Sequence, residues 1–325
     1  MDLRLSIIIP FYNVERFIPE CLDSVFNQDI PLSEYEVICV NDGSPDHSRD
    51  IVIQYMERFP NLRLIEHEKN KKLGAARNTG RTIANGRYIW NVDSDDKIVP
   101  NCLSEMLRIC EENDLDVLEF RPVSFSKEGQ NSLPFVPPIQ NPISGLDYMN
   151  RLSAYELSQM SSVWRKMIRR SFLDENGIFS PEINYGEDVP YSFKVLISAK
   201  RFMCVSNICY LYRSNPDALT GANWQPNAHS LYEKCFHNAK LINDVAACVP
   251  KKYVNVIRSF KEAAGYTLKR YTRFLGQMSS SEQKRFRGFC RESVFKNTFV
   301  FHLFSKRQSF YYLLWLIGVK QQPNR

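Results

Sequence analysis

The chain has no apolar run approaching the roughly 20 residues that a bilayer-spanning helix needs. Its first residues, MDLRLSIII, are interrupted at once by Pro10, so we expect no secretory signal peptide. The nine cysteines form no CxxC pair and are odd in number, which argues against a zinc site and a disulfide framework. These absences predict a cytoplasmic protein whose cysteines serve as small core residues in a reducing compartment.

The sequence also has no strong excess of charge of either sign. The formal net charge is +6 and no base-stacking motif accompanies it, so we expect no nucleic-acid partner. The five histidines show no ligand spacing, and no GxGxxG follows the first predicted strand, which argues against a dehydrogenase of the Rossmann type. The 325 residues, 44% hydrophobic and 24% charged, suit one large domain or one domain with an appendage.

Short β-branched runs alternate with helical periodicity over the first 120 residues. The pattern predicts a helix after Asn13, a helix that starts at Ser44 with Pro45 in its first turn, and further helices over 74–84 and 100–113. This alternation predicts a parallel sheet covered by helices. The strands are expected at 5–9, 36–40, 62–65, 88–92 and 117–120.

The sequence YIWNVDSDD at 88–96 passes from an apolar strand into three carboxylates, Asp93, Asp95 and Asp96. Crowded carboxylates repel one another unless a cation or hydrogen-bond donors offset them. Mg²⁺ and Mn²⁺ prefer oxygen ligands and keep positions open for phosphate, so one interpretation is a metal bound to a diphosphate. The alternative is a polar loop with solvated acids. Polar residues follow two other predicted strands, and ligands bind at the carboxyl ends of such strands, which favours the site.

Beyond residue 120 the pattern is less regular. Residues 125–142 are rich in Pro, Ser, Gly and Asn and predict a long surface loop. A helix is expected after Asp188, and a strand at 204–212. Past about residue 222 helical periodicity dominates.

Five motifs follow one another along the chain: SIIIPFYN at 6–13, VNDGS at 40–44, GAARNTG at 74–80, DSDD at 93–96 and GED at 186–188. In this order and spacing they resemble the family 2 glycosyltransferases of the bacterial surface-polysaccharide type. The resemblance implies an α/β GT-A fold, with a Rossmann-like mixed sheet and helices on both faces, plus a C-terminal helical region. It also implies inverting transfer of a sugar from a UDP-sugar to an acceptor hydroxyl.

The resemblance assigns a nucleotide site to the strand ends. Asp42 would accept the imide N–H of uracil, and Tyr12 would stack on the base. Asn41 departs from the common DDGS pattern, which removes the charge of the first acid but leaves Asp42 intact. A planar guanidinium at Arg77 suits base or phosphate recognition. The implied nucleotide-binding residues are Pro10, Tyr12, Asn13, Asp42, Arg77, Asp93 and Ser94.

The metal and the acceptor side follow from the remaining motifs. Asp93 and Asp95 are the DxD pair that would hold Mn²⁺ or Mg²⁺ on the diphosphate. Asp188 matches the family's general base for the acceptor hydroxyl. Glu187 and Asp96 are candidates for the acceptor side, but a helix-start acid and a turn cap are the alternatives. Trp164 is a further acceptor candidate, with a core tryptophan as the alternative.

The predicted organisation is a catalytic domain at 1–221 and a helical region at 222–325. The nucleotide-binding half would cover about 1–120 and the acceptor half about 121–221. Residues 294–325 contain five basic residues, no acidic ones and eight aromatics, a composition that can lie in a membrane interface. The alternative is a helix packed on the catalytic domain or at a homodimer interface.

The processive synthases of the family carry a QxxRW element and transmembrane helices, and this sequence has neither. We therefore expect the addition of one or a few sugars to a saccharide or lipid-linked saccharide, at the inner face of the cell membrane if the tail binds lipid. A different class of function is a catalytically silent GT-A module that binds a nucleotide sugar or a protein partner. The presence of both Asp95 and Asp188 argues against it. The sequence names neither the sugar nor the acceptor.

Overall fold

The computed structural model describes residues 3–126, 129–183, 186–214, 228–262, 279–281 and 284. The contacts divide the chain into two compact units. The first comprises 1–149 and 159–224, and the second comprises 150–158 and 225–325. All the predicted site residues belong to the first unit. The second contains helix α9 (Ala228–Ala247) and a helical stretch at 254–262. The predicted boundary at 221 lies outside the described residues and stays a prediction.

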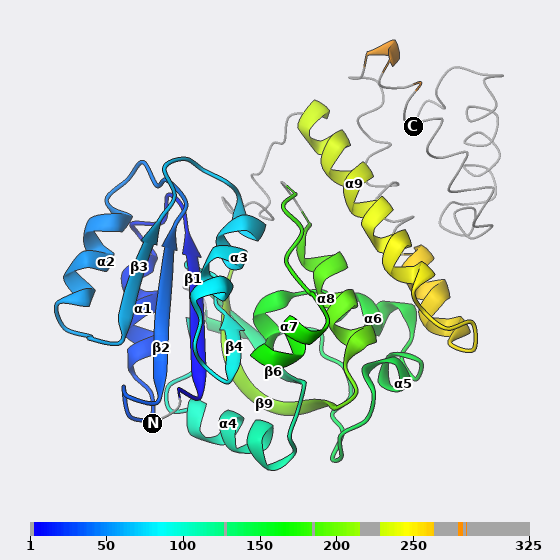
Figure 1. The fold of residues 1–325 in the computed structure, drawn as a ribbon, viewed down its shortest axis with the longest axis horizontal. Coiled ribbons are helices and arrows are strands. Elements are labelled where there is room, and N and C mark those ends of the chain that lie inside the picture. Colours follow the sequence, from blue (N-terminus) through cyan, green and yellow to red (C-terminus); the bar gives the residue numbers. More distant parts are fainter. Residues whose placement is uncertain are drawn as a thin grey trace. The chain divides into compact units, whose positions relative to one another are not determined.

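In its described part the first unit is built on a mixed nine-stranded sheet (Figure 1). β1 (Leu5–Phe11) pairs in parallel with β2 (Tyr35–Asn41) on one side and with β4 (Tyr88–Asn91) on the other. β3 (Leu62–Glu66) extends this parallel part beyond β2. The strand order is β3-β2-β1-β4-β8-β6-β9-β5, and β7 pairs with β6. The remaining strands are β5 (Lys97–Ile98), β6 (Val117–Ser126), β7 (Gly129–Ser132), β8 (Lys166–Arg169) and β9 (Phe202–Arg213).

The part of the sheet beyond β4 is mixed, as the resemblance implies, and differs from the parallel sheet that the β/α alternation predicts. β8 lies antiparallel to both β4 and β6, while β6 and β9 are parallel to each other. β8 has only four residues, too short for a period to show in the sequence. The loop predicted from residue 125 is instead partly a hairpin, because β6 runs on to Ser126 and pairs with β7.

Helices cover both faces of the parallel strands. Residues at odd positions of β1 belong to the same core cluster as α1 (Ile18–Phe26), α2 (Ser48–Met56) and α4 (Leu103–Glu112). The other face packs against α3 (Leu73–Ile83). Here Gly80 is needed, because a Cβ at this position would lie 2.5 Å from Ile8 Cγ2. The other helices described ahead of α9 are α5 (Gly145–Met149), α6 (Ala154–Gln159), the 3₁₀ turn η1 (Val163–Arg165), α7 (Arg170–Glu175) and α8 (Asp188–Ser198).

Two helices begin later than their sequence signals predict. α1 starts at Ile18, because Asn13 has a φ of +56° and does not cap a helix. α2 starts at Ser48, because the Ser44 hydroxyl accepts the N–H of Asn13 and donates to Asp46. The loops after β1 and β2 are therefore fastened to each other rather than taken up into helices.

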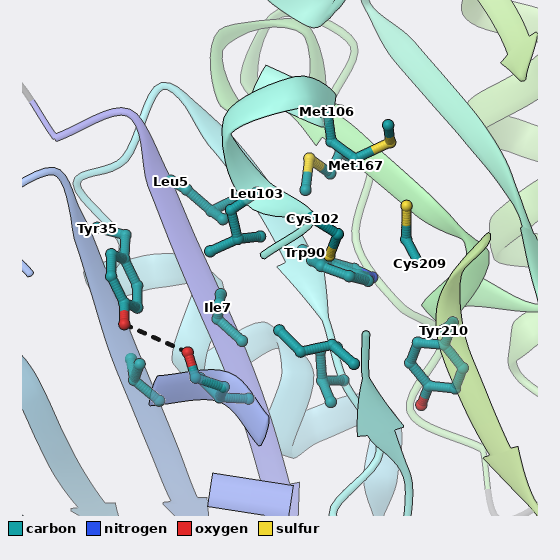
Figure 2. Close-up of a cluster of buried hydrophobic side chains, with 14 of the residues drawn as sticks. Leu5, Ile7, Tyr35, Trp90, Cys102, Leu103, Met106, Met167, Cys209 and Tyr210 are labelled. Atoms are coloured by element: carbon teal, nitrogen blue, oxygen red, sulfur yellow. Dashed lines mark hydrogen bonds between the residues drawn. The ribbon is translucent and has the colours of Figure 1, made fainter. Parts of the chain in front are cut away.

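The core around β4 contains the cysteines and the tryptophan of the YIWN strand (Figure 2). Trp90 lies among Cys102, Met106, Met167 and Tyr210, all of them buried. The side chains of seven cysteines are described, of which six are buried and all seven are free, as the sequence predicts for core residues. Among the described helices none combines the length and the apolar character needed to cross a membrane.

Candidate active site

The carboxyl ends of β1, β2, β3 and β4 meet at one edge of the sheet because these strands are parallel. Tyr12 and Asn13 follow β1, Asp42 follows β2, and Asp93 follows β4. Tyr12 is 46% exposed, so its side chain is accessible to a ligand. Pro10 is buried within β1 and supports this loop from below. The edge thus brings together residues that the sequence predicted to share a site.

Asp42 is buried and accepts three hydrogen bonds from the loop after β3. The backbone N–H groups of Lys71 and Lys72 donate to its two carboxylate oxygens at 2.7 and 2.8 Å. The third partner is Nδ1 of His67, at 2.8 Å from Oδ1, and the ring's Nε2 lies 2.9 Å from the hydroxyl of Thr79. No sequence pattern singles out His67, because this histidine has no ligand or nucleophile at a recognisable spacing.

The DSDD loop is held in shape by β9. Tyr210 donates its hydroxyl to Asp96 Oδ2 at 2.7 Å and accepts the backbone N–H of Asp93 at 3.1 Å. Arg213 donates its backbone N–H to Asp96 Oδ1 at 2.7 Å and its Nε to the carbonyl oxygen of Asp95 at 2.6 Å. Asp96 is 1% exposed, so these contacts favour a supporting role for it over the predicted acceptor role.

Arg77 connects the DSDD loop to the predicted base. Its guanidinium is buried within unit 1 and donates to Asp93 at 2.9 Å, to Glu187 at 3.2 Å and to Asp188 at 2.5 Å. Glu187 and Asp188 are separated from Arg77 by more than a hundred positions in the sequence. The guanidinium binds carboxylates, where the resemblance implied a base or a phosphate.

The electrostatics of this cluster follow from three carboxylates around one cation. Burial raises the pKa of Glu187 to about 8, with the charge of Asp188 as the next cause. Burial also raises the pKa of Asp93 to about 6, although Arg77 opposes that shift. For Arg77, burial disfavours the charged form, but the surrounding carboxylates outweigh it and raise the pKa above its ordinary value. Arg77 therefore stays charged, and the three carboxylates share its single positive charge.

The second oxygen of Asp188 lies near η1. The backbone N–H of Val163 is 3.5 Å from Asp188 Oδ2. The next residue, Trp164, is 8% exposed and stacks on Tyr210 with ring centroids 4.5 Å apart. A buried tryptophan in this stack cannot present its ring to an acceptor, so the core alternative holds for Trp164 and the predicted acceptor contact is not favoured.

Helix α3 carries a row of residues that bind the segment leading into α8. A Cβ at Gly74 would lie 2.2 Å from the carbonyl oxygen of Pro181, so only glycine fits there. The Asn78 side chain donates to the carbonyl of Ser180 at 2.9 Å and accepts its N–H at 2.8 Å. Arg81 donates to the backbone of the same segment. The GAARNTG motif thus places the segment that carries the predicted base.

The carboxylates of the DSDD loop fit a divalent cation. Burial raises the pKa of the Asp95 carboxyl, while its own backbone N–H and the charge of Arg213 favour the ionised form. Asp93 has one carboxylate oxygen on Arg77, and Ser94 between the two acids is buried. In the described ranges no three acidic, histidine or cysteine side chains form a complete metal cage. Two carboxylates suit a cation that takes its other ligands from a diphosphate and water.

A mixed sheet of this order, with acids gathered at the carboxyl ends of its parallel half, defines an α/β GT-A fold. The glycosyl transferase family 2 model matches residues 6–177, and the chain belongs to this family.

The curated relatives include an uncharacterized glycosyltransferase, EpsJ of Bacillus subtilis, 35% identical over 68% of this chain and 64% of that protein. A poly(ribitol-phosphate) beta-glucosyltransferase of Bacillus spizizenii is 34% identical over 65% of this chain. The matched region spans 32% of that enzyme, so in both relatives the match covers less than two thirds of the protein. Among solved structures, residues 1–349 of Staphylococcus aureus TarS with UDP-GlcNAc superpose with a TM-score of 0.71 and 24% identity. That superposition covers 90% of this chain and 81% of the other and supports the fold.

Proposed function

We propose that the protein is an inverting glycosyltransferase of polysaccharide biosynthesis. It would transfer a sugar from a UDP-sugar to a hydroxyl of a saccharide or lipid-linked saccharide. The observation that carries this proposal is the buried Arg77, which joins Asp93 of the DSDD loop to Asp188. The proposed donor-binding acid and the proposed general base are thereby fixed on either side of the Arg77 guanidinium. The sugar and the acceptor hydroxyl would lie between these two acids.

The strand ends supply the donor site. The exposed Tyr12 ring can stack on the base, and Asp42 can accept its imide N–H. Asn13 and Ser94 lie beside these residues in the loops after β1 and β4. When bound, a Mn²⁺ or Mg²⁺ ion held by Asp93 and Asp95 would neutralise charge on the leaving diphosphate. The support for a uridine nucleotide is the carboxylate at Asp42, and TarS, a structural neighbour, is solved with UDP-GlcNAc and with UDP.

Asp188 supplies the base. Its Oδ1 is held by Arg77, so the carboxylate cannot rotate freely, and Oδ2 lies 3.5 Å from the backbone N of Val163. Oδ2 would take the proton of the acceptor hydroxyl while the oxygen attacks the anomeric carbon. The bond to the UDP oxygen breaks on the opposite face of the sugar, so the configuration inverts. Glu187, on the same guanidinium, would orient the acceptor or hold Arg77 in place.

The relatives suggest which acceptors to test. Two of them are named as enzymes that glycosylate poly(ribitol-phosphate), from Bacillus spizizenii and Staphylococcus aureus. A polyol phosphate chain offers the hydroxyl that Asp188 would deprotonate. We therefore include poly(ribitol-phosphate), together with short saccharides and a lipid-linked saccharide, in the acceptor panel.

The test combines a panel of UDP-sugars with one substitution. A matching donor should raise the melting temperature in a Mn²⁺- or Mg²⁺-dependent way, and transfer should follow with one of the acceptors. Asp188→Asn should lower kcat about 10²–10⁴-fold, the range for a lost general base, while UDP still binds. Asp50→Asn, at an exposed position on α2, is the matched control and should leave kcat unchanged.

The second candidate function is a catalytically silent module that binds a nucleotide sugar or a protein partner. It predicts donor binding without transfer or hydrolysis at any acceptor, and no difference between the wild type and Asp188→Asn. Metal-dependent turnover that disappears in Asp188→Asn would exclude it.

A further inference from the structure

His67 is a buried histidine that the proposed reaction does not use. It follows β3 directly, and its side chain is 3% exposed. One ring nitrogen faces the Asp42 carboxylate and the other faces the Thr79 hydroxyl, at 2.8 and 2.9 Å. A carboxylate only accepts, so Nδ1 carries the hydrogen in this contact. Because Thr79 belongs to α3, the ring is fixed at both ends and cannot turn away from Asp42.

The hydrogen bonds to Asp42 can be counted oxygen by oxygen. A carboxylate offers about two acceptor directions on each oxygen. Oδ1 already accepts from His67 and from the backbone of Lys71, and Oδ2 accepts from the backbone of Lys72. Counted over the residues that the structure describes, both acceptor directions of Oδ1 are filled and one direction of Oδ2 is left. The carboxylate can therefore take up one further N–H.

We propose that His67 is a positioning residue for donor selection, which fills Asp42 Oδ1 so that the carboxylate accepts a single N–H from the nucleotide base. The proposal deepens the proposed function and rests on it. Uracil has one imide N–H and meets the single free position. Guanine presents an N–H and an amino group side by side, which a carboxylate recognises with both oxygens, and Oδ1 is not free for the second bond.

Two substitutions of His67 separate the contact with Asp42 from the contact with Thr79. The side-chain amide of His67→Asn can place an N–H close to the position of Nδ1 and so keep the bond to Asp42. The amide of His67→Gln reaches the position of Nε2 instead, keeping the contact with Thr79 and releasing Oδ1. The two variants remove the same ring and differ by one methylene, so each is the control of the other.

The experiment measures the dissociation constants of UDP and GDP by calorimetry in the presence of Mn²⁺. The measured quantity is the dissociation constant of GDP divided by that of UDP. We expect this ratio in His67→Asn to stay within about threefold of the wild-type ratio. His67→Gln should lower this ratio by about tenfold, the effect of one gained or lost hydrogen bond to a charged group. A partly unfolded variant cannot imitate this result, because a reduced folded fraction weakens both nucleotides by the same factor.

The outcomes separate this inference from the proposed function. An equal ratio in the wild type and His67→Gln, with UDP still bound, overturns the role of His67 and leaves the proposed function intact. An equal loss of selectivity in both variants also overturns it, because the ring would then act through its bulk. A wild-type protein that binds neither nucleotide overturns the proposed function and this inference together.

Discussion

At the scale of single residues, the main feature of the site is that one arginine is shared by several carboxylates. Arg77 is shared by Asp93, Glu187 and Asp188, and in the described chain the guanidinium Nε has no hydrogen-bond partner. Removing one partner of a buried ion pair leaves an uncompensated charge, which is more costly than the pair itself is favourable. Substitutions at this cluster are therefore expected to affect folding and the proposed catalysis together.

Lys72 adopts a backbone conformation that glycine favours. Its φ is +78° and its ψ is 164°, and the Asp42 carboxylate holds its N–H there. For a residue with a Cβ this region costs about 1–3 kcal/mol. We expect Lys72→Gly to raise the free energy of unfolding by about 1 kcal/mol, because part of the relieved strain is offset by the greater freedom of glycine in the unfolded chain.

Urea unfolding measures this difference, and Lys71→Gly is the control. Lys71 is the neighbouring exposed lysine and has no positive φ, so its replacement should destabilise the protein by about 0.5 kcal/mol. Equal stabilities of the two glycine variants would contradict the account of strain at Lys72.

Glu187 should make stability depend on pH. Burial raises its pKa from the ordinary 4.5 to about 8, so the folded protein binds this proton more tightly than the unfolded chain does. The stabilisation is complete below about pH 4.5 and is lost as the pH rises through about 8. We expect the free energy of unfolding in metal-free buffer to fall across this window.

Glu187→Gln has no proton to lose there, so its urea-unfolding free energy should fall less steeply between pH 5 and pH 8 than that of the wild type. Other acids of the cluster titrate in both proteins, and the difference between the two slopes isolates Glu187. Parallel pH profiles would show that burial does not shift this carboxyl as described.

At the scale of elements, β9 is the support of the DSDD loop. Tyr210→Phe removes the hydroxyl that binds both Asp93 and Asp96 and leaves one Asp96 oxygen buried without a donor. We expect destabilisation of about 1–3 kcal/mol. Because the loop also loses its anchor, the affinity for Mn²⁺ in the presence of UDP should fall about tenfold.

Tyr35→Phe is the matched control for this prediction. Its hydroxyl is equally buried and donates to the carbonyl oxygen of Val25, on the α1 side of the sheet (Figure 2). It should destabilise the protein without changing Mn²⁺ affinity, measured by isothermal titration. A Tyr210→Phe variant with unchanged metal affinity would mean that the loop keeps its shape without β9.

The sequence predicts the elements of the nucleotide half well, because each has its own local signal. The predicted strand at 88–92 and β4 agree to within a residue, and α3 begins and ends one residue before the predicted 74–84. The late starts of α1 and α2 were missed because Asn13 and Ser44, the predicted helix caps, instead bond to each other and join the loops after β1 and β2. β8 was missed because four residues carry no measurable period.

The site itself could be predicted only where one residue type implies one chemistry. A carboxylate at a strand end implies a cation or a donor, and this placed Asp42, Asp93 and Asp95 at one edge. The partners of Arg77 could not be predicted, since they lie across a contact between distant parts of the chain. His67 was missed for the same reason, because its role comes from a loop that folds back on Asp42.

At the scale of the whole molecule, α3 joins the two halves of unit 1. Its inner side packs on β1 and β2, and its outer row binds the segment around Ser180. The predicted nucleotide and acceptor halves are therefore joined by hydrogen bonds and ion pairs from one helix. The predicted tail at 294–325 lies outside the described residues, and its role stays a prediction.

The tail at 294–325 leads to a testable prediction about how the whole protein binds lipid. With five basic and no acidic residues, it should draw the protein to anionic lipid. We expect the full chain to sediment with vesicles that contain phosphatidylglycerol and a variant lacking 294–325 to remain in the supernatant, with salt weakening the first result. Equal pelleting of the two proteins would favour a tail packed on the protein or at a homodimer interface.

The single guanidinium among three carboxylates has a consequence for inhibitor design. With Asp95 nearby, Arg77 leaves this cluster with surplus negative charge wherever the acids are ionised. An inhibitor that places a protonated amine where the anomeric carbon would lie should be attracted by this charge, whereas a diphosphate mimic without a metal should be repelled. On the proposed function, iminosugars linked to uridine through an uncharged spacer would therefore be better starting points than acidic substrate analogues.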